Sequence, residues 1–108
     1  MDDREKIIIL YDYYGELFSD KQKEYFEEYY FDNLSLAEIA VNEDKSRNAI
    51  HKVIKGVILK LYEFEDKLKL YEKEEKLKMI ISKINDDEIK KEIEGLLWKK
   101  DFQLFWKI

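Results

Sequence analysis

The chain has no proline and only three glycines, at positions 15, 56 and 95, among its 108 residues. These two residue types interrupt helices and form most tight turns, so their scarcity favours long helices over a β fold rich in turns. Hydrophobic residues make up 45% of the chain, too much for a disordered protein even though 42% of the residues are charged. A chain of this length forms one modest core. The sequence therefore predicts a single all-α domain over residues 1–108, a helical bundle.

Several classes of site are excluded by what the sequence lacks. There is no cysteine and a single histidine, His51, so disulfides, thiolate metal sites and histidine clusters are ruled out. No glycine loop for phosphate and no Ser-His-Asp arrangement is found, so we expect no catalysis, no cofactor and no metal. The acidic runs at 27–28 and 86–88 are interpreted as helix surfaces and helix starts. No apolar run approaches a membrane span and the N-terminus is acidic, which predicts a cytoplasmic protein without membrane insertion.

Charge is distributed unevenly along the chain. Residues 1–44 hold 13 acidic and 4 basic side chains, whereas residues 45–62 hold five basic side chains and no acidic one. The net charge of the whole chain is −5. One short positive segment in an acidic protein predicts a local surface that faces an anion.

Helix starts can be read from capping residues. Apolar residues recur at helical spacing over 4–18, and Ser19 or the next residue is placed to cap a second helix. Ser35 and Glu38 form the Ser-x-x-Glu capping box of a short third helix, and Ser46 caps a fourth. The side chains predicted to face inward from the first three helices are Ile7, Leu10, Tyr11, Tyr14, Leu17, Phe18, Tyr25, Phe26, Tyr29, Tyr30, Leu36, Ile39 and Ala40.

The fourth helix carries an apolar seam with heptad spacing. Its members are Ile50, Ile54, Val57, Leu61, Phe64, Leu68 and Tyr71. One interpretation is that the seam packs on the protein's own core; the other is that its outer part, from Leu61 to Tyr71, binds a partner helix or a second copy. The two interpretations are compatible, because different parts of one helix can pack on the core and on a partner. We take 61–108 as a helical extension and a candidate dimerisation part.

Beyond the seam the apolar stripe slips. The next apolar position after Tyr71 is Leu77, which predicts a kink or reversal at 72–76. Asn85 or Asp86 is placed to cap a further helix. Asp101 is placed to cap a last turn with Phe102, Phe105 and Trp106, which is expected to pack on the domain itself.

Residues 20–60 have the order of parts of a helix-turn-helix. Ala40 supplies the small residue where the two helices cross, Ser46 starts the second helix, and Ile50 and Val53 anchor it. Lysine, arginine and asparagine side chains reach base edges and phosphates from such a helix. The residues predicted to contact nucleic acid on its outward face are Arg47, Asn48, His51, Lys52 and Lys55, with Lys45, the helix start at Ser46, and Lys60 on phosphates. The alternative interpretation is a solvated helix surface without a ligand.

The segments KQKEY, YFDNLSLAEIA and SRNAI resemble sigma-70 region 4. More closely, LYDYYGELFSDKQKEYFEEYYFDNLSLAEIA, SRNAIHKVIK and LYEFEDKLKLY resemble the YlxM family of helix-turn-helix proteins, over about residues 5–84. The resemblance implies an all-helical, non-catalytic protein. Because the family is encoded beside components of the signal recognition particle, it also implies a part in that targeting pathway, with DNA, or the particle's RNA or protein, as partner.

One stretch departs from the family pattern. The family has a large apolar residue, a glycine and an apolar residue before the serine, where this chain has Glu43, Asp44 and Lys45. Glycine tolerates a left-handed backbone better than aspartate does, so we expect a longer or looser turn here. Two functions follow: a nucleic-acid-binding regulatory protein, or a protein-interaction module that uses the long helix and the C-terminal helices.

Overall fold

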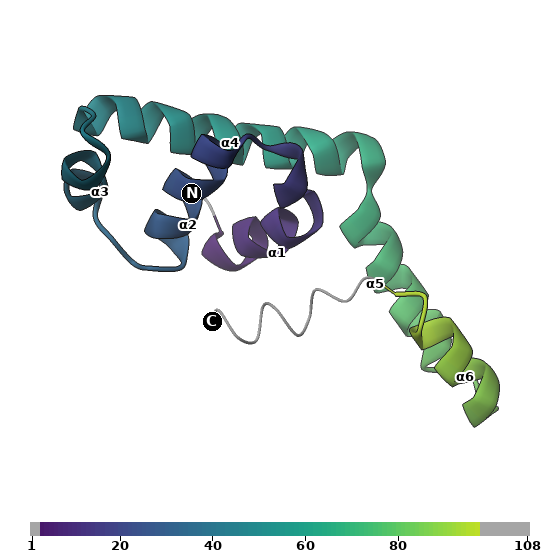
Figure 1. Ribbon diagram of the computed structural model, residues 1–108. Helices are drawn as coiled ribbons and strands as arrows, with labels where there is room; N and C mark the ends of the chain where they lie inside the picture. The colour runs from purple at the N-terminus through teal and green to yellow at the C-terminus, as the bar shows by residue number, and fades with distance from the viewer. Residues whose placement is uncertain (1–2, 98–108) are drawn as a thin grey trace.

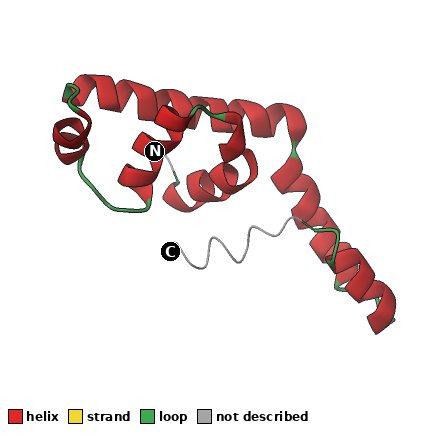
Figure 2. Ribbon diagram, in the orientation of Figure 1, coloured by secondary structure: helices red, strands yellow, loops and turns green. Residues whose placement is uncertain are grey.

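The computed structural model describes residues 3–97, which form helices and no strand, so the all-α prediction is confirmed (Figures 1 and 2). Its elements are α1 (Arg4–Tyr14), the 3-10 turn η1 (Gly15–Leu17), α2 (Asp20–Tyr30), α3 (Leu36–Glu43), α4 (Arg47–Leu68), α5 (Leu70–Ile81) and α6 (Asp87–Glu94). The long helix α4 is the spine of the molecule. Helices α1 and α2 lie along one side of it, α3 lies at its N-terminal end, and α5 and α6 form an arm beyond its C-terminal end.

Side-chain caps start these helices where the sequence predicts them. The Ser19 hydroxyl accepts from the N–H of Gln22, and the Gln22 side chain accepts from the N–H of Ser19. Ser35 and Glu38 form the same reciprocal pair at α3, and the Ser46 hydroxyl accepts from a backbone N–H in the first turn of α4. Each cap satisfies donors that the helix cannot pair itself, and each lies within three residues of its partner, so sequence alone suffices to find it.

The core lies between α4 and the first two helices. Aromatic rings dominate it: Phe26 stacks on Tyr11, with ring centroids 4.1 Å apart, and on Tyr30 at 4.6 Å. The Tyr11 hydroxyl donates to Glu27 at 2.6 Å. The buried core side chains are Ile7, Ile8, Leu10, Tyr11, Tyr13, Tyr14, Phe18, Tyr25, Phe26, Tyr30, Ile39, Ala40, Ile50, Ile54, Val57 and Leu61.

The first helix ends earlier than the spacing predicts. It stops at Tyr14, and the chain continues as a 3-10 turn from Gly15 to Leu17. A 3-10 turn advances the side chains by more degrees per residue than an α-helix does, which rotates Leu17 away from the core. Leu17 is exposed, so its predicted inward position was wrong, whereas Phe18 is buried as expected.

The heptad seam packs mainly on the protein's own core. Its four leading members, Ile50, Ile54, Val57 and Leu61, are buried. The Phe64 ring lies 5.8 Å from that of Tyr14, and Tyr71, now on α5, lies 6.0 Å from the Tyr13 ring. Leu68 is 47% exposed. Of the four residues predicted as a partner seam, Leu61, Phe64 and Tyr71 thus have intramolecular contacts.

A sharp elbow separates α4 from α5. The predicted break at 72–76 was wrong by a few residues, because the chain turns at Lys69, whose φ of 55° is left-handed. The Lys69 side chain does not cap α5. Glu65 takes that role from the preceding turn of α4, accepting from the backbone N–H groups of Tyr71 and Glu72, each at 3.1 Å.

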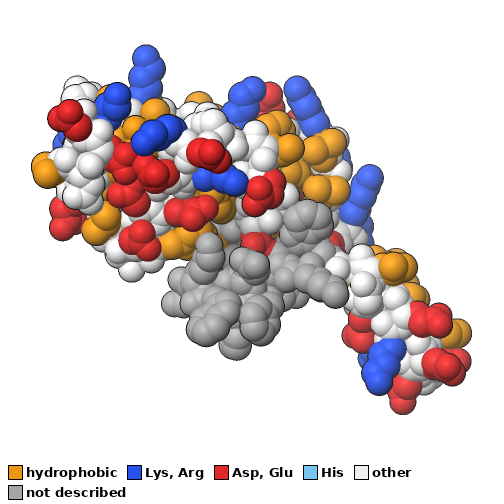
Figure 3. Space-filling model, viewed as in Figure 1, with side chains coloured by type: hydrophobic (Ala, Val, Ile, Leu, Met, Phe, Trp, Pro, Cys, Tyr) orange, Lys and Arg blue, Asp and Glu red, His pale blue; other side chains and the backbone are white. Residues whose placement is uncertain are grey.

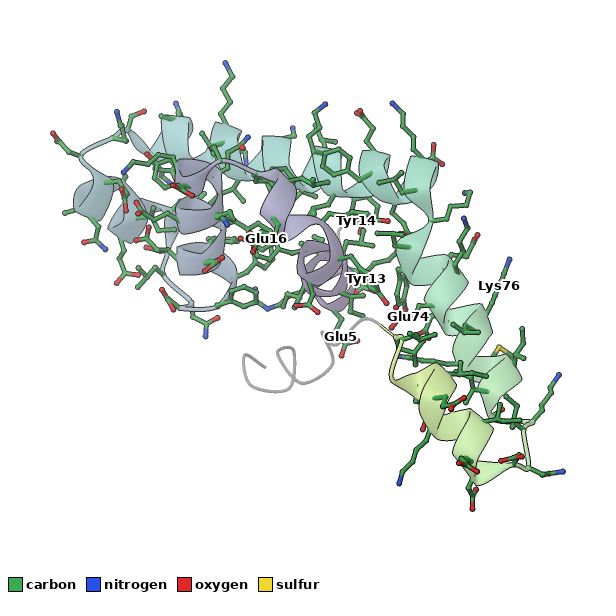
Figure 4. The ribbon with its side chains drawn as sticks, turned by 45° about the vertical axis from the view of Figure 1, so that its right-hand side comes forward. Glu5, Tyr13, Tyr14, Glu16, Glu74 and Lys76 are labelled. Carbon is green, nitrogen blue, oxygen red and sulfur yellow. The ribbon has the colours of Figure 1, made fainter. Side chains whose placement is uncertain are left out.

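Tyr14 connects this elbow to α1 (Figure 4). Its hydroxyl donates to Glu65 at 2.6 Å and accepts from the N–H of Leu70 at 3.1 Å. Burial, and next the hydrogen bond to Glu65, raise the pKa of Tyr14 to about 12, so the hydroxyl keeps its proton at neutral pH. The position of the arm is therefore fixed by a side chain far away in the sequence.

The arm is a helical hairpin with little core of its own. Asp86 caps α6, as predicted, and accepts from the N–H groups of Glu88 and Ile89. Ile81 is the buried side chain of α5, and α6 has none. The predicted last turn around Phe102, Phe105 and Trp106 lies outside the described residues. Within 3–97, no helix has both the length and the apolar character that crossing a bilayer requires.

Candidate nucleic-acid interface

Helices α3 and α4 meet as the two helices of a helix-turn-helix. Ala40 is 8% exposed, Ile39 and Ile50 are fully buried, and α3 packs on both α4 and α2. The small methyl group of Ala40 lets the helices approach closely. The crossing that the sequence predicts over residues 35–55 is therefore present.

The turn between the two helices is closed despite its unusual sequence. Asp44 adopts the left-handed conformation, with φ 56° and ψ 48°, that glycine would take most readily. The Lys45 N–H donates to the carbonyl of Ala40 at 3.0 Å, and the Asp44 N–H donates to that of Val41 at 3.3 Å. The expected longer or looser turn was wrong, because aspartate can occupy this conformation and the carbonyls at the end of α3 still find donors.

The predicted contact residues share one face of α4. Arg47, Asn48, His51, Lys52 and Lys55 are all exposed. At 100° per residue they fall within an arc of about 140°, which begins beside the buried Ile54 and ends opposite the buried stripe. We call these five residues the basic face. In the described part of the chain, no salt bridge engages Arg47, Lys52 or Lys55.

The start of α4 adds backbone donors to this face. Ser46 accepts from the N–H of Ala49 at 3.0 Å, and its carbonyl accepts from Ile50 at 3.1 Å. The helix itself therefore does not use the N–H groups of Arg47 and Asn48, which point along the axis toward solvent. Such a helix end, with its positive dipole, favours an anion.

The predicted phosphate contacts at the two ends of the segment differ in position. Lys45 is exposed in the turn, directly before the basic face. Lys60 lies three turns beyond the start of α4, outside the arc, and its ammonium pairs with Glu63 at 3.4 Å. Lys45 therefore belongs spatially to the basic face, whereas Lys60 does not.

An open pocket that the sequence did not indicate lies beside the basic face. It has a volume of about 340 Å³ between α2 and α4. Its lining residues are Tyr29, Tyr30, Leu36, His51, Ile54, Lys55, Ile58 and Leu59. His51 and Lys55 belong to both the pocket and the basic face, so an aromatic and apolar surface adjoins the cationic one. Residues from α2 and α3 meet α4 only in three dimensions, so no local pattern predicts the pocket.

Acidic side chains gather on a different part of the surface (Figure 3), where Lys and Arg project along α4 while Asp and Glu cover much of the region of α2 and α3. Carboxylate oxygens of Glu24, Glu28 and Glu43 lie within 4.8 Å of one another. The Lys21 ammonium lies 3.3 Å from Glu24 and 3.5 Å from Glu43. This acidic group thus carries its own counter-charge and leaves the basic face unneutralised.

Glu28 is the carboxyl of this group with the largest perturbation. Burial, then a hydrogen bond to Glu43 and the negative charges of Glu43, Glu24 and Asp32, raise the pKa of Glu28 to about 7. The pKa of Glu43 is lowered, first by its hydrogen bond with Glu24 and then by that with Glu28 and by Lys21, with burial opposing the change. The pair is best described as Glu28 holding a proton that it donates to a charged Glu43.

A pH dependence of stability follows from Glu28. Its pKa in the folded protein lies above the unfolded value, so its contribution is complete below about pH 4.5 and is lost as pH rises through about 7. We expect the wild-type free energy of unfolding to decrease from pH 5 to pH 8 by more than that of Glu28→Gln, measured by urea unfolding. Glu5→Gln, an exposed carboxyl on α1, is the control and should keep the wild-type profile. Parallel profiles for wild type and Glu28→Gln would contradict the shared proton.

Comparison with known proteins agrees with this architecture. The model of the family described as "Putative helix-turn-helix protein, YlxM / p13 like" (UPF0122) matches residues 1–100. The UPF0122 protein MYPE4850 of Malacoplasma penetrans is 39% identical over 102 residues, which cover 90% of this chain and 94% of that protein. The UPF0122 protein NT01CX_2214 of Clostridium novyi is 47% identical over 92 residues, 82% of this chain and 80% of that one.

A third relative comes from Fusobacterium nucleatum. The UPF0122 protein FN1394 of Fusobacterium nucleatum is 37% identical over 97 residues, covering 90% of this chain and 94% of its own length. The family model spans both the helix-turn-helix and the arm. The chain belongs to the UPF0122 family of YlxM/p13-like helix-turn-helix proteins.

Proposed function

We propose that this protein is a nucleic-acid-binding regulatory protein of the cytoplasm that acts by binding and without catalysis. The observation that carries the proposal is the basic face: five exposed polar and cationic side chains on the second helix of a helix-turn-helix, without an acidic residue from Lys45 to Tyr62. In this motif the second helix enters the major groove through its N-terminal residues. Here those residues are Arg47, Asn48 and His51.

Each part of the face has a chemical role in this proposal. Arg47 and Asn48 carry the side chains that form paired hydrogen bonds to guanine and adenine edges. Lys45, Lys52 and Lys55, with the N–H groups at the start of α4, contact phosphates on either side. Lys60 is a weaker candidate for phosphate contact, because it lies off the face and pairs with Glu63.

A part in the signal recognition particle pathway is the finer form of this proposal. Its support is the resemblance to the YlxM family, whose members are encoded beside components of that particle. The RNA of the particle is then the nucleic acid to compare with duplex DNA. Since the deep major groove of an RNA helix is narrow, RNA binding would rest on phosphates, with little base reading by Arg47.

The test is binding of the full chain to duplex DNA and to the particle's RNA by fluorescence anisotropy. With about four phosphate contacts, we expect affinity to fall about 100-fold when salt is raised from about 50 to about 200 mM. Lys52→Glu with Lys55→Glu should weaken binding at least about 100-fold, since two attractions become repulsions next to the same phosphates.

The matched control reverses two lysines off the basic face. Lys67→Glu with Lys83→Glu makes the same change in net charge on exposed positions and should alter affinity less than about fivefold, because distant exposed charges are screened. Equal effects of the two double variants, or binding that ignores Lys52 and Lys55, would refute the basic face as the site.

The second candidate is a protein-interaction module, favoured by the arm, whose helices expose apolar side chains. In that case a pull-down from cell extract retains the same partner after nuclease treatment, and the basic-face variants retain it too. A nuclease-sensitive pull-down supports the first proposal instead.

A further inference from the structure

The arm lacks enough internal packing to account for its own helices. Among residues 70–97, Ile81 is the only buried side chain, at 4% exposure, and α6 buries none. A helix of eight residues is not stable in water without tertiary contacts. A further contact that buries apolar side chains of α6 would therefore stabilise this helix.

The exposed apolar side chains of α5 and α6 occupy a defined position on each helix. On α5, Leu77 and Ile80 lie side by side, and the buried Ile81 lies about 40° beyond Leu77. On α6, Ile89 lies about 40° before the half-buried Ile93, and Leu96 follows in the next turn of chain. On both helices the exposed strip is displaced from the packed strip in the same rotational sense.

This shared displacement puts both strips on one side of the hairpin. Helices α5 and α6 run antiparallel and side by side (Figure 1). Ile81 is buried and Ile93 is half-buried, as expected where these two strips face each other. Two antiparallel helices are related by a two-fold axis perpendicular to the plane that contains them. This axis maps each side of the hairpin onto itself, so exposed strips that are rotated in the same sense on both helices lie on the same side of the hairpin. The result is one apolar arm face, formed by Leu77, Ile80, Ile89 and Leu96. Ile80 is 59% exposed and Leu96 86% exposed, while Met79 is exposed on the other side of α5.

The two borders of the arm face carry opposite charges. Along its α5 border lies the exposed Lys76, whose ammonium is 3.9 Å from Glu72, and along its α6 border lie the exposed Glu88 and Glu92. In Figure 4, Lys76 points away from the core, whereas Glu74 points toward it. The face is therefore mainly apolar in the middle, with Lys76 on one edge and two glutamates on the other.

We propose that the arm face binds the arm face of a second copy of this chain, forming a homodimer. A two-fold axis parallel to the helices places α5 of one copy over α6 of the other, so Lys76 opposes Glu92 of the second copy and both apolar strips are buried. The perpendicular two-fold axis would set lysine over lysine and glutamate over glutamate. Charge therefore selects the first arrangement, a four-helix bundle of two hairpins.

The arrangement has a consequence for the whole molecule. Because α5 of both copies runs in the same direction along the axis, both helix-turn-helix cores leave the bundle at the same end. The inference does not depend on nucleic-acid binding, since it concerns only the arm, and the dimer can be measured without any nucleic acid.

The test is the oligomeric state of the full chain by sedimentation at several concentrations. We expect a dimer that dissociates on dilution. Ile80→Asp with Ile89→Asp puts four carboxylates in the buried centre and should raise the dissociation constant at least about 100-fold. Met79→Asp, an equally exposed apolar position off the face, is the matched control and should leave it within about threefold.

The axis is tested by charge exchange. Lys76→Glu alone should weaken the dimer about tenfold, and adding Glu92→Lys should restore it. Circular dichroism checks that each variant keeps its helices. A full-length chain that stays monomeric overturns the proposal. This holds whatever then covers the arm face, residues 98–108 included. A dimer that Ile80→Asp with Ile89→Asp leaves intact overturns the proposal too. A dimer that Lys76→Glu strengthens overturns the parallel axis.

Discussion

Phe26→Ala is expected to lower the free energy of unfolding by about 3–5 kcal/mol. The ring is fully buried, stacks on Tyr11 and Tyr30 on its two sides, and meets the edge of Phe31. Alanine would leave a cavity between α1 and α2, and the neighbouring rings cannot move enough to fill it. The free energy gained by transferring the Phe26 ring from water into the core is lost as well. Small domains have about 5–15 kcal/mol of stability in all, so this change removes a large part of it.

Thermal unfolding followed by circular dichroism measures the effect, and a fall in Tm of about 15 °C or more is expected for a domain near 100 residues. Leu17→Ala is the matched control, because Leu17 belongs to the adjacent turn but is 61% exposed. It should change the free energy by less than about 0.5 kcal/mol. Similar losses for the two variants would contradict the assignment of the aromatic stack as the centre of the core.

Glu65→Ala is expected to release the arm from the core and to cost about 3 kcal/mol, because three donors lose their charged acceptor. The carboxylate accepts from the Tyr14 hydroxyl and from the backbone N–H groups of Tyr71 and Glu72. No side chain at Lys69 can replace it as the cap of α5. The left-handed backbone at Lys69 is then no longer held by contacts on both sides.

Amide hydrogen exchange at Tyr71 and Glu72 reports directly on this cap. Exchange at both should accelerate in Glu65→Ala, while amides in the middle of α4 keep their protection. Glu65→Gln retains one acceptor oxygen with nearly the same shape and should show a smaller effect. The control Glu63→Ala removes a carboxylate from the same turn that pairs only with exposed lysines in the described chain, and should leave the elbow amides unchanged. Unchanged exchange in Glu65→Ala would disprove the capping role.

The candidate site itself was largely readable from the sequence. The exposed face from Arg47 to Lys55 follows from helical periodicity, since Ile50 and Ile54 fix which side is buried. Lys60 was predicted to join this site but lies off the face and pairs with Glu63. Counting charges along the chain does not show the angular position of a side chain on the helix. The pocket beside His51 and the carboxyl group around Glu28 were also missed, because each joins residues from different helices.

Sequence by itself determined where α2, α3 and α4 begin and which stripe of α4 is buried. Ser19, Ser35 and Ser46 cap their helices through contacts no more than three residues away, and such short-range hydrogen bonds form in any context that lets the helix start. The expectation of a looser turn at Asp44 was wrong because glycine is preferred in the left-handed conformation but is not required there.

Tertiary structure alone decided where α4 ends and how the arm leaves the core. Nothing in the residues around Lys69 marks a break, since neither glycine nor proline is there. The break is stabilised by Tyr14, 56 residues before Leu70, whose hydroxyl joins the Leu70 amide to the Glu65 carboxylate. Local periodicity records only neighbours along the chain, so a helix end that depends on such a distant hydroxyl becomes visible only after the chain has folded.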